Sequence, residues 1–240
     1  MPQVLVFSGP ALPLLDMANQ MKPDGWDLQV CTSDSTEPEV TEAAKIADFI
    51  LVFGHGVSDT VLRVAKKTKL VQLCSAGFDG INLRLAGELG IPVANNGGAN
   101  AIPVAEFAIT LTLSTIRHLT VAAADTVAGQ WMCPEVDGRD SHELFATTVG
   151  IIGAGRIGST VAGMLRGFET TTLYTDKVRS EKAESFGAVK VELDELLERS
   201  DVVTLHTPLD GSTHGLIGED ELRLMKKTAI LINTCRGPVV

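Results

Sequence analysis

Short apolar runs alternate with amphipathic stretches in the first hundred residues of the chain. Helical patterns lie around residues 12–21, 41–46, 60–66 and 83–89, between β-rich runs. Continuous apolar runs such as Ile50-Leu51-Val52-Phe53 are typical of strands buried on both faces. Strands that alternate with helices at this spacing predict a parallel sheet covered by helices on both sides. The predicted strands are Val4–Phe7, Leu28–Cys31, Phe49–Phe53, Leu70–Cys74 and Pro92–Ala94.

A second series of the same kind begins at Thr148. An Asn- and Gly-rich stretch, residues 95–100, precedes it and predicts a hinge between two lobes. We expect a long helix from about Pro103 to about Leu119 or beyond, because proline suits the first turn of a helix. The irregular segment Ala128–Phe145 is a connector or a subunit-contact arm. The predicted strands of the second series are Val149–Ile152, Thr171–Thr175, Val189–Val191, Val202–His206 and Ala229–Asn233.

The run Gly153-Ala154-Gly155-Arg156-Ile157-Gly158 follows an apolar strand and opens a helical pattern. Glycines at this spacing allow a tight turn at Gly153, a close approach of the backbone to phosphates at Gly155, and close packing of helix on strand at Gly158. The helix N-terminus then offers N–H groups to a pyrophosphate. Asp176 ends the next apolar run, where a carboxylate that binds the ribose hydroxyls is expected. Together these features favour a dinucleotide-binding site over a merely tight turn.

Composition excludes several kinds of partner. The 240 residues carry a net charge of −10, so no basic surface for nucleic acid is expected. No apolar run is long enough to cross a membrane, and the N-terminus lacks the features of a signal peptide. The four cysteines, Cys31, Cys74, Cys133 and Cys235, show no spacing for metal ligands. We therefore expect no metal, no membrane, no nucleic acid, and a cytoplasmic, reducing location.

Further motifs lie at the ends of the predicted strands. They are Ser75-Ala76-Gly77-Phe78-Asp79, Val104-Ala105-Glu106, His206-Thr207-Pro208-Leu209 and Asn233-Thr234-Cys235-Arg236-Gly237-Pro238. With the glycine run, this set resembles the D-isomer-specific 2-hydroxyacid dehydrogenases, which include glyoxylate/hydroxypyruvate reductases and phosphoglycerate dehydrogenases. The likeness extends from about Val4 to Val240, with the motifs in family order.

The resemblance implies an α/β protein of two domains and a function for each. Residues 1–98 would form a flavodoxin-like substrate (catalytic) domain, and residues 99–240 a Rossmann-type NAD-binding domain that is incomplete at its C-terminus. The implied reaction is hydride transfer between NAD(H) and a small 2-oxo or D-2-hydroxy acid. A homodimer is implied for the full-length form.

The resemblance also assigns roles to residues. Arg236 matches the catalytic arginine, whose planar guanidinium suits a carboxylate. Ala76 and Gly77 match a loop that binds the substrate carboxylate through backbone N–H groups, and Ser75 is either part of that loop's function or a turn former. NAD is favoured over NADP because Asp176 would repel a 2′-phosphate, although Lys177 and Arg179 lie close enough to soften that preference. The remaining cofactor-binding candidates are Gly153, Gly155, Arg156, Ile157, Gly158, His206, Thr207, Pro208, Thr234 and Cys235.

One part of the family pattern is missing from this sequence. Family members continue past the arginine motif to a glutamate and a histidine, and that histidine protonates the carbonyl oxygen. This chain stops at Val240, so the resemblance implies an incomplete form with weak or no activity. A positioned acid typically contributes about 10²- to 10⁴-fold to the rate. A non-catalytic NAD(H)-binding sensor is the alternative; formate dehydrogenase has a similar cofactor lobe, but no feature here favours it.

Overall fold

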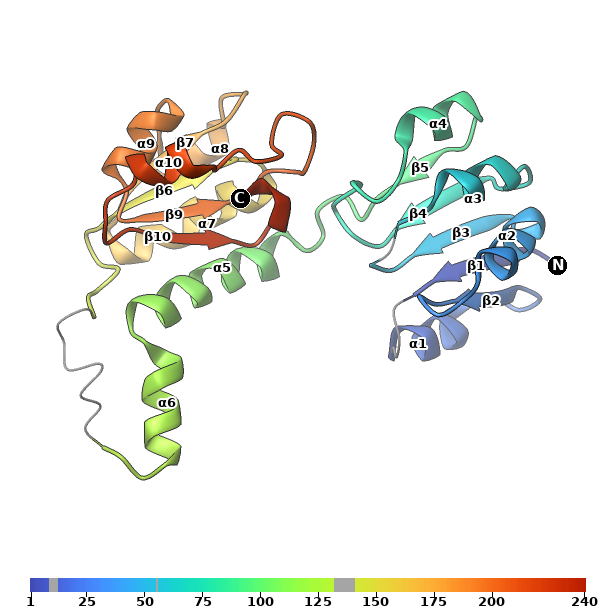
Figure 1. Cartoon of the computed structure of the whole chain (residues 1–240), viewed down its shortest axis with the longest axis horizontal. Helices are drawn as coiled ribbons and strands as arrows, with labels where there is room; N and C mark the ends of the chain where they lie inside the picture. The colour runs from blue at the N-terminus through green and yellow to red at the C-terminus, as the bar shows by residue number, and fades with distance from the viewer. Residues whose placement is uncertain (9–12, 55, 132–140) are drawn as a thin grey trace. The chain divides into compact units, whose positions relative to one another are not determined.

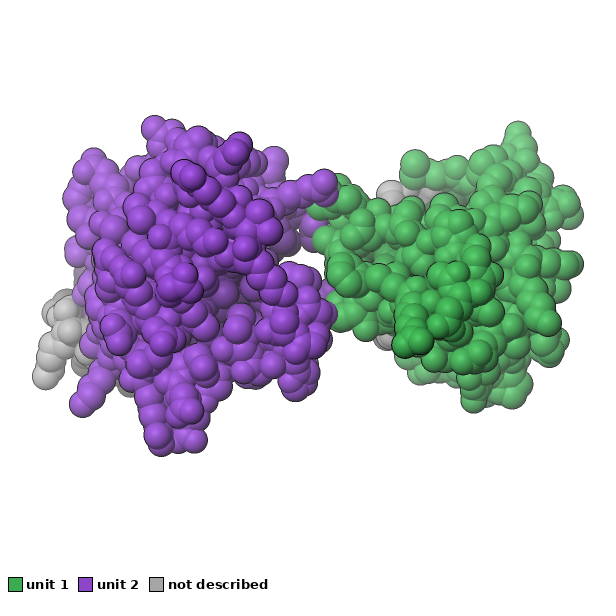
Figure 2. Space-filling model, turned by 90° about the horizontal axis from the view of Figure 1, so that it is seen from above, with its two compact units in different colours: residues 1–99 green, residues 100–240 purple. Residues whose placement is uncertain are grey.

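The computed structural model describes residues 1–8, 13–54, 56–131 and 141–240. Two compact units emerge, Met1–Ala99 and Asn100–Val240, coloured separately in Figure 2. Each unit contains one five-stranded sheet, so each is described by itself. The predicted segment 128–145 falls partly outside the described residues, and Cys133 lies outside them.

The sheet of the first unit is entirely parallel. Its strands follow the order β2-β1-β3-β4-β5, which is the order of flavodoxin-like folds. The flavodoxin-like prediction is therefore confirmed. The strands are β1 (Gln3–Phe7), β2 (Asp27–Cys31), β3 (Phe49–Val52), β4 (Leu70–Leu73) and β5 (Val93–Ala94).

Four helices connect these strands (Figure 1). They are α1 (Pro13–Met21), α2 (Glu37–Ile46), α3 (Asp59–Val64) and α4 (Leu83–Glu88). One core forms where α2, α3 and α4 bury Ala44, Leu62 and Leu85 against the strand residues Leu5 and Ile50. The helix expected from residue 41 begins at Glu37, because Glu39 accepts a hydrogen bond from the backbone N–H of Thr36 (2.8 Å) and fastens the first turn.

The sheet of the second unit is also parallel, in the order β10-β9-β6-β7-β8. If β6 is counted as the first strand, the order reads 5-4-1-2-3, which is that of the dinucleotide-binding fold. The Rossmann-type prediction is confirmed. The strands are β6 (Thr148–Ile152), β7 (Thr171–Thr175), β8 (Val189–Lys190), β9 (Val202–Leu205) and β10 (Ile230–Asn233).

Side chains of this sheet alternate between two cores, as the pleat of a strand requires. Ile151, Tyr174 and Val202 join one core with helices α5 (Ala101–Ile116), α7 (Arg156–Leu165) and α8 (Glu181–Ser185). Ile152, Leu173 and Val203 join the other with α9 (Leu193–Arg199). The remaining elements are α6 (Leu119–Val127), α10 (Glu219–Leu224) and the short 3-10 helices Arg166–Phe168 and Gly237–Val239.

One expectation about this unit needs correction. The long helix ends at Ile116, because the chain turns at His118, which has a left-handed backbone (φ 47°), and a separate helix α6 follows. The expected strand Ala229–Asn233 corresponds to β10 (Ile230–Asn233). In the structure β10 lies at the edge of the sheet and pairs with β9, and Ile230 and Leu231 are half-buried.

Within the described ranges, no single helix combines the length and hydropathy of a membrane span. Helices α5 and α6 reach that combination only as a pair, and the chain bends by 68° between them.

Candidate functional site

The glycine turn between β6 and α7 is shaped by three different constraints. Gly153 has φ +90°, and a Cβ added there would lie 2.8 Å from the carbonyl oxygen of His206. A Cβ on Gly158 would lie 2.1 Å from the carbonyl oxygen of Gly153. Gly155, by contrast, would place its Cβ in open space, and it is the N-cap of α7. The first and third glycines therefore serve packing, whereas the second leaves the N-terminus of α7 accessible to an anion.

Asp176 follows β7, and its carboxylate accepts hydrogen bonds from the backbone of the glycine turn and from the backbone of its own loop. Its Oδ2 accepts a hydrogen bond from the N–H of Ala154 (2.7 Å), and its Oδ1 accepts one from the N–H of Val178 (3.3 Å). These bonds fix the carboxylate beside the glycine turn. This is the place that a ribose-binding acid occupies in dinucleotide-binding folds.

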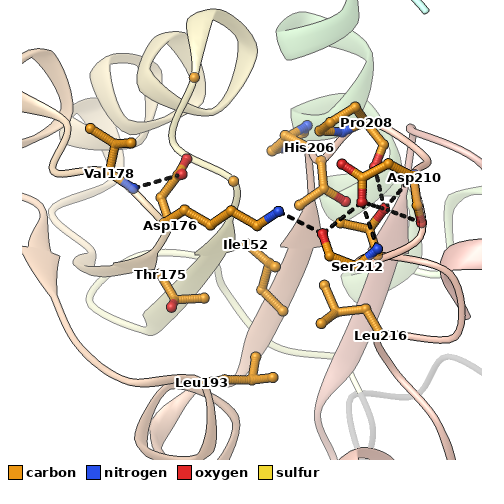
Figure 3. A pocket seen from close by; sticks show the side chains of 15 residues that line it. Ile152, Thr175, Asp176, Val178, Leu193, His206, Pro208, Asp210, Ser212 and Leu216 are labelled. Atoms are coloured by element: carbon orange, nitrogen blue, oxygen red, sulfur yellow. Dashed lines mark hydrogen bonds between the residues drawn. The ribbon is translucent and has the colours of Figure 1, made fainter. Parts of the chain in front are cut away.

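A pocket of about 450 Å³ opens at the carboxyl ends of β6, β7 and β9 (Figure 3). Its volume lies in the usual range for a small-molecule site. Ligands of open α/β sheets bind at this edge. It is lined by Ile152, Gly153, Gly155, Thr175, Asp176, Lys177, Val178, Leu193, His206, Thr207, Pro208, Asp210, Ser212, Thr213 and Leu216.

The segment after β9 contributes an imidazole and a hydroxyl to this pocket. His206 Nε2 lies 3.0 Å from Thr204 Oγ1, and its Nδ1 lies 3.4 Å from Thr234 Oγ1. Burial lowers the pKa of His206 to about 4, so the ring is neutral at pH 7. The buried Thr207 Oγ1 has no hydrogen-bond partner among the described residues. An unpaired buried hydroxyl in a pocket wall is suited to a polar ligand group.

Two polar residues of the pocket were not anticipated from the sequence. Asp210 Oδ1 accepts hydrogen bonds from the N–H and the hydroxyl of Ser212 (2.7 and 2.6 Å), and these bonds lower the pKa of Asp210. Lys177 Nζ donates to Ser212 Oγ (2.6 Å) and so links the loop after β7 to the loop after β9 (Figure 3). The Asp-Gly-Ser sequence signals a turn, but it does not reveal which loop it meets.

The residues after β10 form a compact turn. Asn233 Oδ1 accepts a hydrogen bond from the N–H of Cys235 (3.0 Å), and Asn233 Nδ2 donates to the carbonyl of Arg236 (2.9 Å). Arg236 is half-buried, and its Nη1 donates to the carbonyl oxygen of Cys235 (2.8 Å). Thr234 approaches His206 as described above. Thr234, Cys235 and Arg236 do not line the 450 Å³ pocket, and neither do Arg156, Ile157 and Gly158.

The loop after β4 in the first unit is also held by local hydrogen bonds. Ser75 Oγ donates to the carbonyl oxygen of Gly77 (2.8 Å), which is the geometry of a turn former. Asn95 Nδ2 donates to the carbonyl of Ala76 (2.8 Å), and the N–H of Asn96 donates to the carbonyl of Ser75 (3.2 Å). Ser75, Ala76 and Gly77 are half-buried at the carboxyl end of their strand.

The second unit fits a dinucleotide on three structural grounds. The N-terminus of α7 is open beside Gly155, the Asp176 carboxylate is fixed next to it, and the unpaired Thr207 hydroxyl lies in the same pocket. Residues 109–240 match the family described as D-isomer specific 2-hydroxyacid dehydrogenase, NAD binding domain. The chain belongs to this dehydrogenase family. Its second unit carries the family's NAD-binding domain.

Individual dehydrogenases of the family are similar over most of the chain. A glyoxylate reductase of Korarchaeum cryptofilum is 39% identical over 75% of this chain and 55% of its own length. A D-3-phosphoglycerate dehydrogenase of Methanocaldococcus jannaschii is 35% identical over 95% of this chain and 43% of its own length. The chain thus spans about half the length of these curated relatives.

A solved structure shows the same architecture with ligands. It is a D-lactate dehydrogenase from Aquifex aeolicus complexed with NAD and lactic acid, with 32% identity and a TM-score of 0.83. The match covers 99% of this chain and 70% of that dehydrogenase. The family assignment made from the motifs is therefore confirmed, together with NAD as the cofactor of its NAD-binding domain.

Proposed function

We propose that the protein is an NAD-dependent oxidoreductase that transfers a hydride between NAD(H) and a small 2-oxo or D-2-hydroxy acid. The observation that carries the proposal is the pocket at the carboxyl edge of the second sheet, where an open helix N-terminus adjoins a fixed carboxylate. Family membership supplies the class of reaction. In domain terms, we propose residues 1–98 as the substrate domain and residues 99–240 as the cofactor domain.

The cofactor-binding roles follow from the local structure. The N–H groups around Gly155, Arg156 and Ile157 at the start of α7 would bind the pyrophosphate, and Asp176 the adenosine ribose. His206, Thr207 and Pro208 would line the path of the cofactor, and Thr234 and Cys235 would face its nicotinamide half. When bound, NAD⁺ would accept the hydride and NADH would supply it. Because a carboxylate repels a 2′-phosphate, we propose NAD as the preferred form over NADP.

The substrate-binding roles are proposed for two separate segments. Arg236 would bind the substrate carboxylate and polarise its carbonyl, because a guanidinium offers paired N–H donors. Asn233 Nδ2 donates a hydrogen bond to the carbonyl oxygen of Arg236. This bond fixes the backbone from which the Arg236 side chain extends. The backbone N–H groups of Ala76 and Gly77 would bind the carboxylate as well, with Ser75 holding their turn.

Reduction of a ketone also needs a proton, and this requirement sets the expected rate. His206 is a poor donor at neutral pH, because a group with a pKa of about 4 is almost fully deprotonated there. We therefore propose that turnover by these 240 residues is slow. A positioned general acid typically contributes about 10²- to 10⁴-fold to the rate.

Two measurements on the purified chain test the proposed function. The first is NADH binding, followed by the change in NADH fluorescence, and the second is NADH oxidation with glyoxylate, hydroxypyruvate or pyruvate. We expect saturable binding and slow, substrate-dependent oxidation. Binding with no oxidation of any oxo acid would favour a non-catalytic NAD(H)-binding protein, and absence of binding would reject both.

Arg236→Lys separates the substrate role from the cofactor role. Lysine keeps the charge but loses the paired donors, so oxidation should fall by about 10²-fold, the scale of losing one strong transition-state contact. The Kd for NADH should stay within about twofold of the wild-type value, since the proposed role of Arg236 is to bind the substrate carboxylate and not the cofactor. Equal oxidation rates in variant and wild type would remove Arg236 from the reaction.

We also propose a homodimer formed through α5 and the segment after it. Several apolar side chains there are exposed, including Phe107 (56%), Val127 (90%) and Trp131 (89%). Exposed large apolar side chains support a proposed subunit interface. Light scattering coupled to size-exclusion chromatography should give about twice the 25.4 kDa chain mass, and Val127→Glu should shift the population to the monomer.

A further inference from the structure

The loop between β7 and α8 carries two cations directly after the ribose-binding acid. Lys177 and Arg179 follow Asp176 by one and three positions. A cation at this place in a dinucleotide-binding fold accommodates the 2′-phosphate of NADP. The discrimination between NAD and NADP therefore depends on where these two side chains are held.

Arg179 is held by a carboxylate on α8. Its Nε donates to Glu184 Oε1 and Oε2 (2.9 and 2.8 Å), and its Nη2 lies 2.7 Å from Oε2. A guanidinium engaged by both oxygens of a carboxylate has its strongest donors committed. Arg179 consequently does not contribute to the pocket lining.

A buried tyrosine fixes the carboxylate that holds Arg179. Tyr174 is fully buried, and its hydroxyl donates to Glu184 Oε1 (2.8 Å) while accepting from the N–H of Ser180 (3.0 Å). The bonds from Arg179 and Tyr174 lower the pKa of Glu184, so this carboxylate stays ionised at neutral pH. The side chain of Glu184 is 24% exposed, against 74% for Arg179. Glu184 is thus the fixed partner and Arg179 the movable one.

Two side chains of the loop between β7 and α8, those of Asp176 and Ser180, form hydrogen bonds with the backbone of Ala154 in the glycine turn. Ala154 donates its N–H to Asp176 Oδ2 (2.7 Å), and its carbonyl oxygen accepts from Ser180 Oγ (2.7 Å). Arg179 lies inside this fastened segment. Whether the Arg179 guanidinium can reach a ligand therefore depends on its side-chain conformation, which the hydrogen bonds to Glu184 hold in place.

We propose that Glu184 is a specificity-determining residue that favours NAD over NADP by withholding the Arg179 guanidinium from the ribose pocket. The inference rests on the proposed binding of NAD(H) by this unit. Glu184 acts through Arg179 and has no contact with the cofactor itself. Asp176 disfavours a 2′-phosphate directly, and Glu184 removes a cation that would otherwise offset that repulsion.

The other cation of the loop is engaged in a different way. Lys177 lines the pocket, and its ammonium reaches Ser212 on the loop after β9. Glu184 does not contact Lys177, so the effect of Lys177 on NADPH is the same in the wild type and in Glu184→Gln. Substitution of Glu184 therefore isolates the contribution of Arg179.

The size of the effect follows from the exposure of the pair. Ion pairs that involve exposed side chains shift equilibria by at most about fivefold. Because Tyr174 pre-positions Glu184, we expect a value toward that limit. Glu184→Gln should lower the Kd for NADPH by about threefold to fivefold and change the Kd for NADH by less than about twofold.

The test is a set of NADH and NADPH titrations on wild type and variants. Glutamine still accepts the Tyr174 hydrogen bond, so Glu184→Gln is expected to fold. Glu184→Asp, which shortens the side chain and breaks the two-oxygen contact, is the second variant if the first melts early. Adding Arg179→Ala to Glu184→Gln should abolish the gain for NADPH. Glu219→Gln is the matched control, since it breaks the exposed Glu219–Arg223 pair on α10 with the same change in charge.

The outcomes are distinct. A rise in NADPH affinity in Glu184→Gln that disappears with Arg179→Ala, and is absent in Glu219→Gln, supports the inference. An unchanged ratio of the two Kd values in folded Glu184→Gln overturns it, while wild-type binding of NADH leaves the proposed function intact. Failure of the wild type to bind either cofactor rejects the proposed function and this inference together.

Discussion

At the residue scale, His206 shows how burial sets the chemistry of the pocket. The ring lies between two threonine hydroxyls and, with its pKa of about 4, stays neutral where a free histidine would begin to protonate. It can orient a ligand but not supply a proton at pH 7. Its charge state also makes the stability of the protein depend on pH.

The stability of the wild type should fall as the pH drops from about 6.5 to 4. In this window the unfolded chain binds a proton at His206 that the folded chain does not, and this difference favours unfolding. The loss attributable to His206 should be on the order of 2 to 3 kcal/mol between pH 7 and pH 4.5. Urea unfolding of wild type and His206→Gln at both pH values measures it; equal losses in the two proteins would contradict the assignment.

Two glycines of the turn provide a matched pair of substitutions. Gly158→Ala forces a methyl against the Gly153 carbonyl and should cost about 1 to 3 kcal/mol of stability. Gly155→Ala meets open space and should change stability by less than about 0.5 kcal/mol. NADH binding should weaken by about tenfold in Gly155→Ala, because the methyl stands where the phosphates approach. Thermal melts and NADH titrations compare the two, and similar melting temperatures for both variants would contradict the packing argument.

The tight turn at Gly153 and the close packing at Gly158 could be predicted from the sequence, because their requirements are local. A turn followed by a helix start is visible in a few consecutive residues. Ser212 and Glu184 could not, since their importance depends on contacts with Lys177 and Arg179 across a loop or a helix. Side-chain pairing over such distances leaves no periodic signal.

At the element scale, each sheet has an aspartate at the amino end of its strands that bonds to a backbone N–H and to a lysine. In the first unit Asp48, just before β3, accepts from the N–H of Gln3 (3.0 Å) and from Lys69 Nζ (3.0 Å). In the second unit Asp201, just before β9, accepts from the N–H of Thr148 (2.9 Å) and from Lys226 Nζ (2.7 Å). Each aspartate therefore satisfies the first N–H of the neighbouring central strand.

Asp201→Ala should destabilise the second unit by about 1 to 3 kcal/mol, because it leaves the Thr148 N–H without its acceptor. Lys226→Ala removes only a partly exposed ion pair and should cost less than about 1 kcal/mol. Chemical denaturation of both variants distinguishes the two contributions. A larger effect for Lys226→Ala than for Asp201→Ala would show that the charge pair, and not the backbone contact, stabilises this corner.

The order and type of these elements follow from their hydrophobic patterns, whereas the boundary between α5 and α6 does not. No proline or glycine marks the break between α5 and α6, and His118 has a left-handed backbone that few residues other than glycine adopt. The hydrophobic pattern alone therefore does not reveal this break.

At the scale of the whole molecule, the account depends on the second unit as a dinucleotide-binding domain. Ligand that binds only the folded state raises its stability, by about 2.7 kcal/mol at a hundredfold excess over Kd. NADH should therefore raise the melting temperature of the wild type, and a folded Gly155→Ala variant should respond less at the same concentration. An equal rise in melting temperature in both proteins would indicate that NADH binds away from the glycine turn.

The most direct measurement is a fluorescence titration of the folded chain with NADH. The account predicts a saturable change in wild type that is weakened in Gly155→Ala. No saturable signal up to millimolar NADH from protein that melts cooperatively would contradict the cofactor site, and with it the proposed function.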